Sequence, residues 1–474
     1  MKIVMKFGGT SLTDGEGIKR VVEITKTSLL KEIKIVIIVS AMASITDSLF
    51  EVISRAELGD LEYIKDFIGK LATIHHNAVK VTVNDKEILE KAMSEINALV
   101  KELERILFSV SYLREATPRS RDYILSFGEK LSTAIVCAAF QNQKFEAYWF
   151  TGGEAGIITD DNFGDAKPLM NITTQQVKEK INPLVEEAQI PIITGYIART
   201  QDNVTTTLGR GGSDYSATII ARALDFDEVW LWKDTDGIMT ADPKIEPMAT
   251  TIPIISYSEA IEMAYFGAKV IHPKALEPVF EQQIKVRIKN IFNPNGLDTI
   301  IEKHPWTNTD KIVKSIVMIR DVAMVTVSGT EMIGMPGIAA KVFGILGDNK
   351  INILMISQSS SEANISFIVP RGDLNNIVNV VESALLGSVV KNIYSESDIC
   401  VVAVVGVGMK GIPGVAAKVF KAVADEGINV RMIAQGSSEL NISFVVGEEN
   451  DVRTVRALHK EFQMDKFNRS VSLI

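Results

Sequence analysis

The chain has 474 residues, 46% hydrophobic and 23% charged, which indicates a folded globular protein of roughly two to four domains. Its formal net charge of −9 argues against nucleic acid or an anionic membrane surface as a partner. Two cysteines, Cys137 and Cys400, are too few for a disulfide framework and lie in no metal-binding pattern. The N-terminus lacks a signal-peptide pattern, so we expect a cytoplasmic protein.

Residues 1 to about 303 alternate apolar strands with helical patterns. This alternation predicts an α/β layer with a mostly parallel sheet. The most apolar run, 33–43, is too short to span a bilayer and predicts a buried strand. Residues 60–116 are charged and helix-periodic and predict a helical excursion, with His75 and His76 on its solvated surface. The expected strands are IVMKFGG (3–9), IKIVIIVSAM (33–42), FEAYWFTG (145–152), PIITGYIA (191–198) and EVWLWKDTDG (228–237).

The first strand ends in MKFGGTS, which places Lys6 just before Gly8 and Gly9 and the hydroxyl of Ser11 just after them. Glycines let a phosphate approach backbone N–H groups, and the start of the next helix adds positive potential. A lysine there would supply a mobile positive charge for the phosphates. Because no Walker pattern is present, an ordinary strand–turn–helix with a surface lysine fits this motif equally well.

Three later segments add polar groups at expected strand or helix ends. Ser40 and Thr46 follow the second strand, and Glu129 follows Gly128 in SRDYILSFGEKLS at an expected helix start.

TTTLGRGGSDYSA places Arg210, two glycines, Ser213 and Asp214 in one short turn before a helix. An arginine can bind a carboxylate through two hydrogen bonds, and glycines expose backbone amides. Helix capping by Ser213 or Asp214 is the alternative, but it does not account for the arginine and two glycines.

The C-terminal third contains a duplication. Residues 328–369 align without a gap onto 405–446, with 24 of 42 positions identical. Each copy predicts a strand, a glycine-bearing loop, a helix and two further strands, followed by a second helix at 373–386 or 450–462. The expected fold is a ferredoxin-like βαββαβ unit, present twice. The segment 292–310, rich in Pro, Asn and Gly, is the expected linker before it.

The second copy contains a literal G-x-G-x-x-G at Gly406, Gly408 and Gly411, the pattern of a dinucleotide-binding turn. In the first copy Glu331 occupies the position of Gly408. A glutamate would oppose a pyrophosphate by both charge and bulk, so the glycines are expected to serve a loop geometry that the copies share.

Taken together, MKFGGTS, SFGEKLS, TTLGRGGSDYSA, DGIMTADPK and MAYFGAKVIHP resemble the aspartokinase family, within the amino acid kinase superfamily. The duplicated units resemble the paired ACT domains of that family. The resemblance covers essentially the whole chain and implies a catalytic domain at 1–303, divided near residue 200 into substrate and nucleotide lobes. ACT domains are expected at 304–396 and 397–474, and a strand at 312–319 could belong to the second. Because the second expected ACT domain takes up the remaining residues, we expect no appended homoserine dehydrogenase.

The resemblance also implies residue roles. Glu129 would pair with the substrate ammonium group and Arg210 with its α-carboxylate, while Asp214 would orient Lys6 and the phosphoryl acceptor. Other substrate contacts are implied for Ser40, Thr46 and Ser213. Nucleotide contacts are implied for Lys6, Gly8, Gly9, Ser11, Lys233, Asp234, Met239, Asp242, Lys244 and Lys269.

Three of these nucleotide positions depart from the family, which usually has threonine at 233, tyrosine at 239 and arginine at 244. The departures put the adenine-pocket and phosphate contacts in question, though not the reaction. ATP is the expected phosphoryl donor, with Mg²⁺ held mainly through the nucleotide and no metal-ligand set in the protein.

Where ACT units meet, the resemblance implies an inhibitory amino acid, threonine in preference to lysine, and a homodimer or homotetramer. Amide side chains suit such a ligand because each offers both a donor and an acceptor; the alternative is that they only satisfy strand ends. The expected effector residues are Met335, Gly337, Asn352, Gln358, Ile412, Gly414, Asn429 and Gln435.

The expected reaction is ATP-dependent phosphorylation of the β-carboxylate of L-aspartate, the first step of lysine, threonine and methionine biosynthesis. The alternatives are a kinase for another amino acid carboxylate, such as glutamate or aminoadipate, and a catalytically weak amino-acid-binding regulatory protein.

Overall fold

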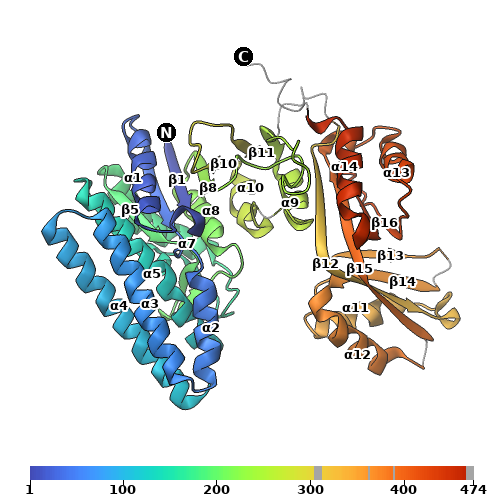
Figure 1. The fold of residues 1–474 in the computed structure, drawn as a ribbon, viewed down its shortest axis with the longest axis horizontal. Helices are drawn as coiled ribbons and strands as arrows, with labels where there is room; N and C mark the ends of the chain where they lie inside the picture. Colours follow the sequence, from blue (N-terminus) through green and yellow to red (C-terminus); the bar gives the residue numbers. More distant parts are fainter. Residues whose placement is uncertain (269, 304–311, 361–362, 388–389, 466–474) are drawn as a thin grey trace. The chain divides into compact units, whose positions relative to one another are not determined.

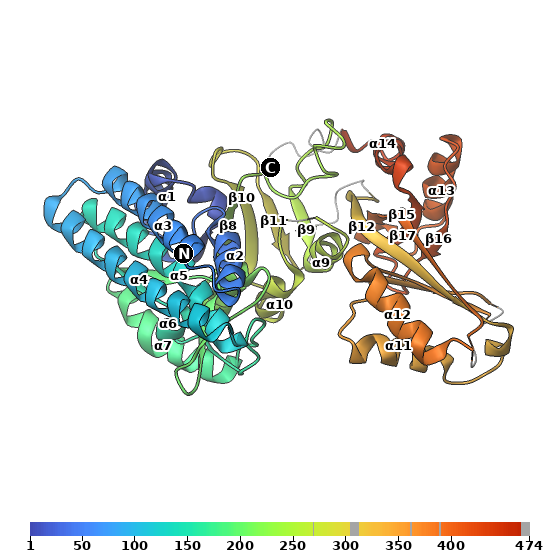
Figure 2. The same ribbon diagram turned by 60° about the horizontal axis from the view of Figure 1, so that its bottom comes forward.

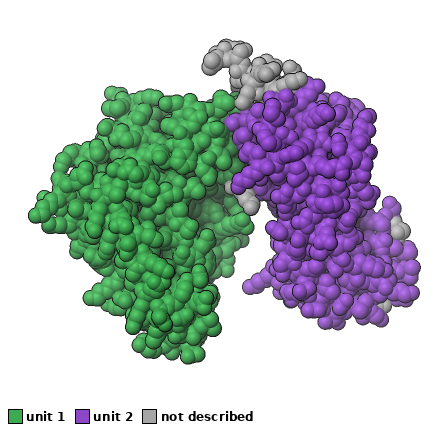
Figure 3. Space-filling view, in the orientation of Figure 1, with its two compact units in different colours: residues 1–238, 253–257, 270–305 green, residues 239–252, 258–269, 306–474 purple. Residues whose placement is uncertain are grey.

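The computed structural model describes residues 1–268, 270–303, 312–360, 363–387 and 390–465. They form two compact units (Figure 3). Unit 1 comprises residues 1–238, 253–257 and 270–305, and unit 2 comprises 239–252, 258–269 and 306–474.

Unit 1 is built on an eight-stranded sheet in which every pairing is parallel except that of β10 with β11 (Figure 1). The predicted α/β fold with a mostly parallel sheet is confirmed. The central strands are almost wholly buried because helices cover both faces. In spatial order the strands are β3 (Ala147–Phe150), β5 (Ile190–Thr194), β2 (Lys34–Val39), β1 (Lys2–Phe7), β8 (Glu228–Lys233), β10 (Lys285–Asn290), β11 (Thr299–Glu302) and β9 (Ile254–Ser256). β11 falls within the expected linker 292–310, whose residues 304–310 lie outside the described part of the chain.

The helical excursion forms as α3 (Leu61–Thr82) and α4 (Lys86–Leu113), which pack with one another and with α5 (Pro118–Asn142) (Figure 2). α5 is long and apolar enough to cross a membrane, but 89% of its apolar window is buried, as in the core helix of a globular domain. The remaining elements of unit 1 are η1 (Gly9–Ser11), α1 (Gly15–Leu29), α2 (Ile45–Glu57), α6 (Gly152–Ala155), α7 (Met170–Glu186), α8 (Gly212–Leu224), η2 (Pro273–Leu276), α10 (Glu277–Gln282) and a small sheet of β4 (Ile158–Thr159), β6 (Ile197–Thr200) and β7 (Thr205–Thr207).

Unit 2 contains the two copies of the repeat on one six-stranded sheet in the order β13-β14-β12-β15-β17-β16. In the first copy, β12 (Ser315–Ser328) leads to η3 (Thr330–Met332), α11 (Ile338–Asp348), β13 (Met355–Gln358), β14 (Asn364–Pro370), η4 (Arg371–Asp373) and α12 (Leu374–Leu385). In the second, β15 (Asn392–Val405) leads to η5 (Val407–Met409), α13 (Val415–Asp425), β16 (Met432–Ala434), β17 (Asn441–Gly447), η6 (Glu448–Asn450) and α14 (Asp451–Glu461).

The long strand β12 serves both copies. Its second half pairs with β14 of the first copy, whereas residues 315–319 pair with 401–405 of β15. Val313 and Ile316 lie in the core of the second copy beside Phe444 and Leu458. The residues at the start of β12 therefore belong to the second copy, although they precede the first copy in the sequence.

Two glycines of the G-x-G-x-x-G pattern serve packing within unit 2. A Cβ added at Gly406 would lie 2.4 Å from the Ile312 carbonyl oxygen, and one added at Gly408 would lie 2.9 Å from Ile312 Cα. The loop thus packs directly on the backbone that leads into β12. The structure gives these two glycines a packing role.

Two segments that precede the repeat in sequence also belong to unit 2. In the first, Ala241 and Ile245 join the core of the second copy, and the Thr240 carbonyl accepts a 2.8 Å bond from Ile316 N. The second includes most of α9 (Tyr257–Tyr265), where buried Glu259 contacts Lys314 Nζ at 3.1 Å.

Candidate active site

The carboxyl ends of four neighbouring parallel strands meet at one edge of the sheet in unit 1. Phe7 of β1 is in register with Val39 of β2 and Trp232 of β8, and Val39 is in register with Thr194 of β5. Ligands of open α/β sheets bind beyond this edge. Three of the sequence motifs, those around Lys6, Ser40 and Lys233, end here because each follows or closes one of these strands.

A buried carboxylate joins two lysines at this edge. Asp214, in the first turn of α8, has one oxygen 2.6 Å from Lys6 Nζ and the other 2.7 Å from Lys233 Nζ. Lys6 and Asp214 are each 5% exposed. Burial favours the neutral acid, but the charges of Lys233 and Lys6 prevail and lower the pKa of Asp214 to about 2.

The pKa of Lys6 is lowered to about 8, first by burial, against the opposing charge of Asp214 and with a further lowering contribution from Lys233. A lysine of this kind is charged at neutral pH but close to releasing its proton. Lys233, which the sequence assigned to the nucleotide face at a position that departs from the family, therefore lies on the same carboxylate as Lys6.

Glu129 is 3% exposed and lies within the electrostatic influence of Lys6. Burial raises the pKa of Glu129 to about 8, although a backbone hydrogen bond from Ala41 and the charge of Lys6 oppose this. Among the described residues, its Oε2 has no hydrogen-bond partner. A carboxylate with one unsatisfied buried oxygen is suited to receive a ligand cation.

The expectation that Glu129 begins a helix is wrong. It lies in the middle of α5, which begins at Pro118 after the N-cap Thr117. The glycine before it serves helix packing: a Cβ at Gly128 would lie 2.9 Å from the Ala41 Cβ. Gly128 thus allows α5 to approach the loop after β2 closely.

The other predicted substrate contacts lie on loops of the same unit. Ser40 is half-buried, and its carbonyl accepts a 2.6 Å bond from Ser132 of α5. Thr46 is half-buried in the first turn of α2, and Ser213 packs against Gly195 at the end of β5. Arg210 is exposed, and its charge reaches His272. An exposed guanidinium is accessible to an incoming carboxylate.

Of the residues predicted to contact the nucleotide, some lie in unit 1 beside Lys6 and others belong to unit 2. A Cβ at Gly8 would lie 3.5 Å from Lys6 Nζ, so the Gly8–Gly9 turn lies beside the lysine. Ser11 is buried, and within the described chain its hydroxyl has no partner. Asp234 is exposed just after β8.

By contrast, Met239, Asp242 and Lys244 belong to unit 2. The Met239 carbonyl accepts a bond from Ser315, and Asp242 Oδ1 accepts one from Lys244 N. Lys269 lies outside the described residues.

The eight expected effector residues occupy equivalent places in the two copies. Gly337 and Gly414 precede α11 and α13 with positive φ values of 89° and 88°. Met335 and Ile412, just before them, are 48% and 47% exposed. The amides lie on exposed positions beside or at the ends of β13 and β16, which contact one another: Asn352, Gln358, Asn429 and Gln435.

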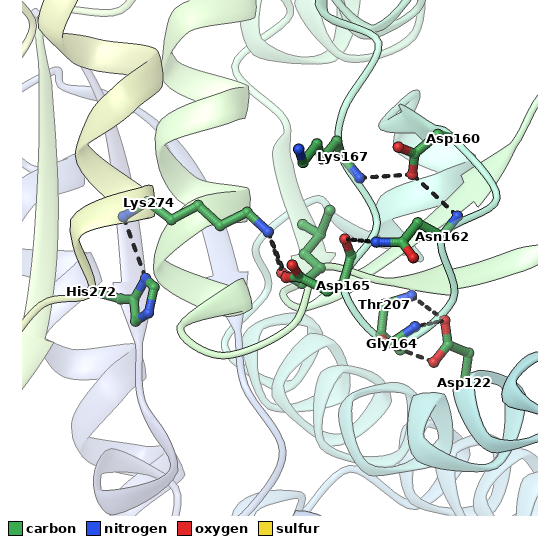
Figure 4. Close-up of polar contacts among 10 residues, drawn as sticks. Asp122, Asp160, Asn162, Gly164, Asp165, Lys167, Thr207, His272 and Lys274 are labelled. Atoms are coloured by element: carbon green, nitrogen blue, oxygen red, sulfur yellow. Dashed lines mark hydrogen bonds and ion pairs between the residues drawn. The ribbon is translucent and has the colours of Figure 1, made fainter. Parts of the chain in front are cut away.

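Sequence reasoning overlooked one buried carboxylate near the site. Asp122 lies seven residues before Glu129 on α5, is 1% exposed and accepts three hydrogen bonds (Figure 4). The signal was an acidic side chain on the apolar helix, about two turns from Glu129 and thus on the same face. Across the described part of the chain, no group of three or more His, Cys, Asp or Glu side chains could hold a metal ion.

The sequence of the chain matches known protein families and known proteins. The amino acid kinase family matches residues 1–290, and the ACT domain matches 325–385 and 402–462. Aspartokinase 1, chloroplastic, of Arabidopsis thaliana is 33% identical over 97% of this chain and 80% of that protein. The chain also matches the bifunctional aspartokinase/homoserine dehydrogenase 1, chloroplastic, of the same plant at 33% identity, but spans only 52% of its length.

Solved structures extend the similarity to three dimensions. E. coli aspartokinase III in complex with aspartate and ADP has a TM-score of 0.83 and 27% identity, over 97% of this chain and 99% of that one. The same enzyme in complex with lysine and aspartate has a TM-score of 0.78 over the same shares of the two chains. The chain therefore belongs to the amino acid kinase family and, with its tandem ACT domains, to the aspartokinases within it.

Proposed function

We propose that this chain transfers the γ-phosphoryl group of ATP to the β-carboxylate of L-aspartate, giving 4-phospho-L-aspartate, under feedback control by an amino acid. The observation that carries the proposal is the buried Lys6–Asp214 pair at the carboxyl edge of the sheet, with half-buried Lys233 on the same carboxylate and Glu129 close by. The relatives named aspartokinase support it.

The main obstacle to the reaction is charge. The β-carboxylate of aspartate is already an anion at neutral pH, so it needs no strong general base to attack the γ-phosphorus. It must, however, approach a second anion in line. Lys6 and Lys233 place positive charge where the two anions meet, and the backbone N–H groups of the Gly8–Gly9 turn, which lies beside Lys6, would add hydrogen-bond donors.

Substrate orientation is assigned to Glu129 and Arg210. The ammonium group of aspartate would satisfy the free oxygen of Glu129, and the guanidinium of Arg210 would bind the α-carboxylate. Two contacts at one end of the substrate leave the β-carboxylate free to point toward the lysines, which is how positioning lowers the barrier.

The residues at this edge fit a magnesium nucleotide. Both oxygens of Asp214 are engaged by lysines, so the metal would be held chiefly by the phosphates, where it neutralises their charge.

The direct test is formation of the acyl phosphate, trapped as a hydroxamate, with aspartate, glutamate and aminoadipate compared at equal concentrations. We expect turnover with aspartate and its absence in the Lys6→Ala variant. Turnover with glutamate or aminoadipate instead would favour the other amino acid kinases. The absence of turnover with all three acids, together with amino acid binding, would favour a regulatory protein.

For regulation we propose that threonine, rather than lysine, binds at the loops before α11 and α13, and that the active form is a homodimer or homotetramer. The preference for threonine comes from the family resemblance of the sequence. Isothermal titration with each amino acid tests the choice, and sedimentation with and without the ligand tests the assembly. Biosynthesis of lysine, threonine and methionine, in the cytoplasm, is the proposed setting.

A further inference from the structure

The buried carboxylate of Asp122 binds two separate segments of unit 1, strand β7 and the loop 160–167. Asp122 Oδ2 accepts hydrogen bonds from Thr207 N at 2.8 Å and from Gly164 N at 3.0 Å, and Oδ1 accepts one from the Thr207 hydroxyl at 2.9 Å. Figure 4 shows the Asp122 side chain pointing from its helix toward both Gly164 and Thr207. Thr207 lies 85 residues from Asp122 and Gly164 lies 42 residues away, so these bonds join distant parts of the chain.

Each of the three joined segments leads to a residue of the candidate site. α5 carries Glu129 seven residues beyond Asp122. Thr207 ends β7 and is three residues from Arg210. The loop 160–167 lies against the turn that holds Arg210, because a Cβ at Gly209 would lie 2.3 Å from Asp165 Oδ1.

The loop 160–167 is held at several further points. Asp160 Oδ1 accepts bonds from Lys167 N at 2.9 Å and Asn162 N at 3.3 Å, and Asn162 Nδ2 donates to the Asp165 carbonyl at 3.0 Å. Lys274 Nζ lies 2.6 Å from Asp165 Oδ1 (Figure 4). The loop is thus internally braced, and Asp122 fixes its position relative to α5.

We propose that Asp122 is a positioning residue for substrate binding: by holding β7 and the loop 160–167 against α5, it sets the separation between Arg210 and Glu129. This inference rests on the proposed function and deepens it. The amino acid would be gripped at its carboxylate and its ammonium group only when these two side chains are correctly spaced. Asp122 itself need not touch the substrate.

The chemistry of the position supports this role. Burial raises the pKa of Asp122, whereas the hydrogen bonds from Gly164 and Thr207 lower it. A buried carboxylate is an expensive group for a helix core unless it is fully engaged. Here the Asp122 carboxylate accepts hydrogen bonds from the backbone amides of Gly164 and Thr207, which would otherwise need other partners.

The test compares Asp122→Ala with Asp122→Asn. Alanine removes all three contacts, and we expect the KM for aspartate to rise about 10- to 100-fold while the KM for ATP changes little, since small misplacements of binding groups cost that much. Asparagine can place its oxygen at the Oδ2 position and donate its amide to the Thr207 hydroxyl. It should therefore keep the KM for aspartate within about threefold of the parent, by the same reasoning.

Asp85→Ala is the matched control, because Asp85 also accepts backbone bonds, from Glu87 N and Ile88 N, but caps α4. It should leave both KM values unchanged. Should Asp122→Ala fail to fold, Thr207→Val removes only the 2.9 Å hydroxyl bond and should move the KM for aspartate in the same direction, by a smaller factor.

A double-mutant cycle with Arg210→Ala gives the sharpest readout. If Asp122 acts through Arg210, the effect of Arg210→Ala on the KM for aspartate must be smaller in the Asp122→Ala background. Independent effects, an unchanged KM for aspartate in Asp122→Ala, or equal damage by alanine and asparagine would each overturn the proposal. All of these comparisons require that the parent protein phosphorylates aspartate. If the proposed function is wrong, the parent itself will be inactive on aspartate, and this outcome is distinct from failure of the Asp122 proposal.

Discussion

Replacing Lys233 by methionine tests how the two lysines share one carboxylate. Lys6 and Lys233 contact opposite oxygens of Asp214 at 2.6 and 2.7 Å, and the charge of Lys233 is one of the causes that lower the pKa of Lys6 to about 8. Without Lys233, Lys6 faces the same anion without a competing cation. Its protonated form then becomes more stable, so the pKa of Lys6 should rise.

The size of the rise follows from Coulomb's law. Two unit charges roughly 6 Å apart repel by about 2.8 kcal/mol at an effective dielectric constant of about 20, which corresponds to about two pKa units. Solvent near the partly exposed Lys233 reduces this, so an increase of about one to two units is expected.

The assay is the pH dependence of kcat/KM for MgATP, which reports groups of the free enzyme. If charged Lys6 binds the phosphates, kcat/KM in the parent falls as pH rises through about 8, and in Lys233→Met the fall moves to higher pH. The control is Lys34→Met, which removes a lysine paired with Glu186 on the surface and should leave the profile unchanged.

The reasoning would be refuted by an alkaline limb at the same pH, or at lower pH, in Lys233→Met. Either result would mean that Lys6 is not the group that titrates, or that the two lysines do not interact in solution.

Four further outcomes are expected. Lys6→Ala should lower kcat by orders of magnitude with unchanged circular dichroism, because a buried phosphate-binding charge is lost; near-normal turnover would contradict its role. The KM for aspartate should fall about tenfold for each pH unit between pH 6 and 7. Burial raises the pKa of Glu129 to about 8, and only the ionised Glu129 carboxylate binds the substrate ammonium group. Glu129→Gln should abolish this pH dependence. Gly211→Ala should raise the KM for aspartate about tenfold. The φ of Gly211 is 74°, and the new Cβ would lie 2.5 Å from the Cβ of His272, so the turn that holds Arg210 would have to shift. An unchanged KM would show that the turn tolerates a side chain. The pKa of buried His75 is lowered to about 4, first by burial, so the folded state disfavours the protonated imidazole and the protein loses stability as pH falls below about 6.5. Denaturant unfolding should show that the parent loses about 2 kcal/mol of unfolding free energy between pH 7 and 5. His75→Phe should lose less.

Much of the fold follows from local patterns. Alternating strands, glycine-bearing turns and helices predict the parallel sheet, and the gapless duplication predicts two copies of one structural unit. Lys6 and the GRGGSD turn are recognisable because their chemistry lies within a few consecutive residues. The position of Glu129 on its helix is not, since Gly128 suggests a helix start, whereas it serves close packing against Ala41.

Contacts between distant residues decide the rest. Only the tertiary structure brings Lys233 onto Asp214, joins Asp122 to Thr207 across 85 positions, and buries His75, which its polar neighbours suggest is solvated. It also places Met239 with the ACT copies and routes β12 through both of them. A sequence pattern reports the preferences of neighbouring residues, whereas burial and hydrogen bonding at these positions depend on which distant backbone arrives there.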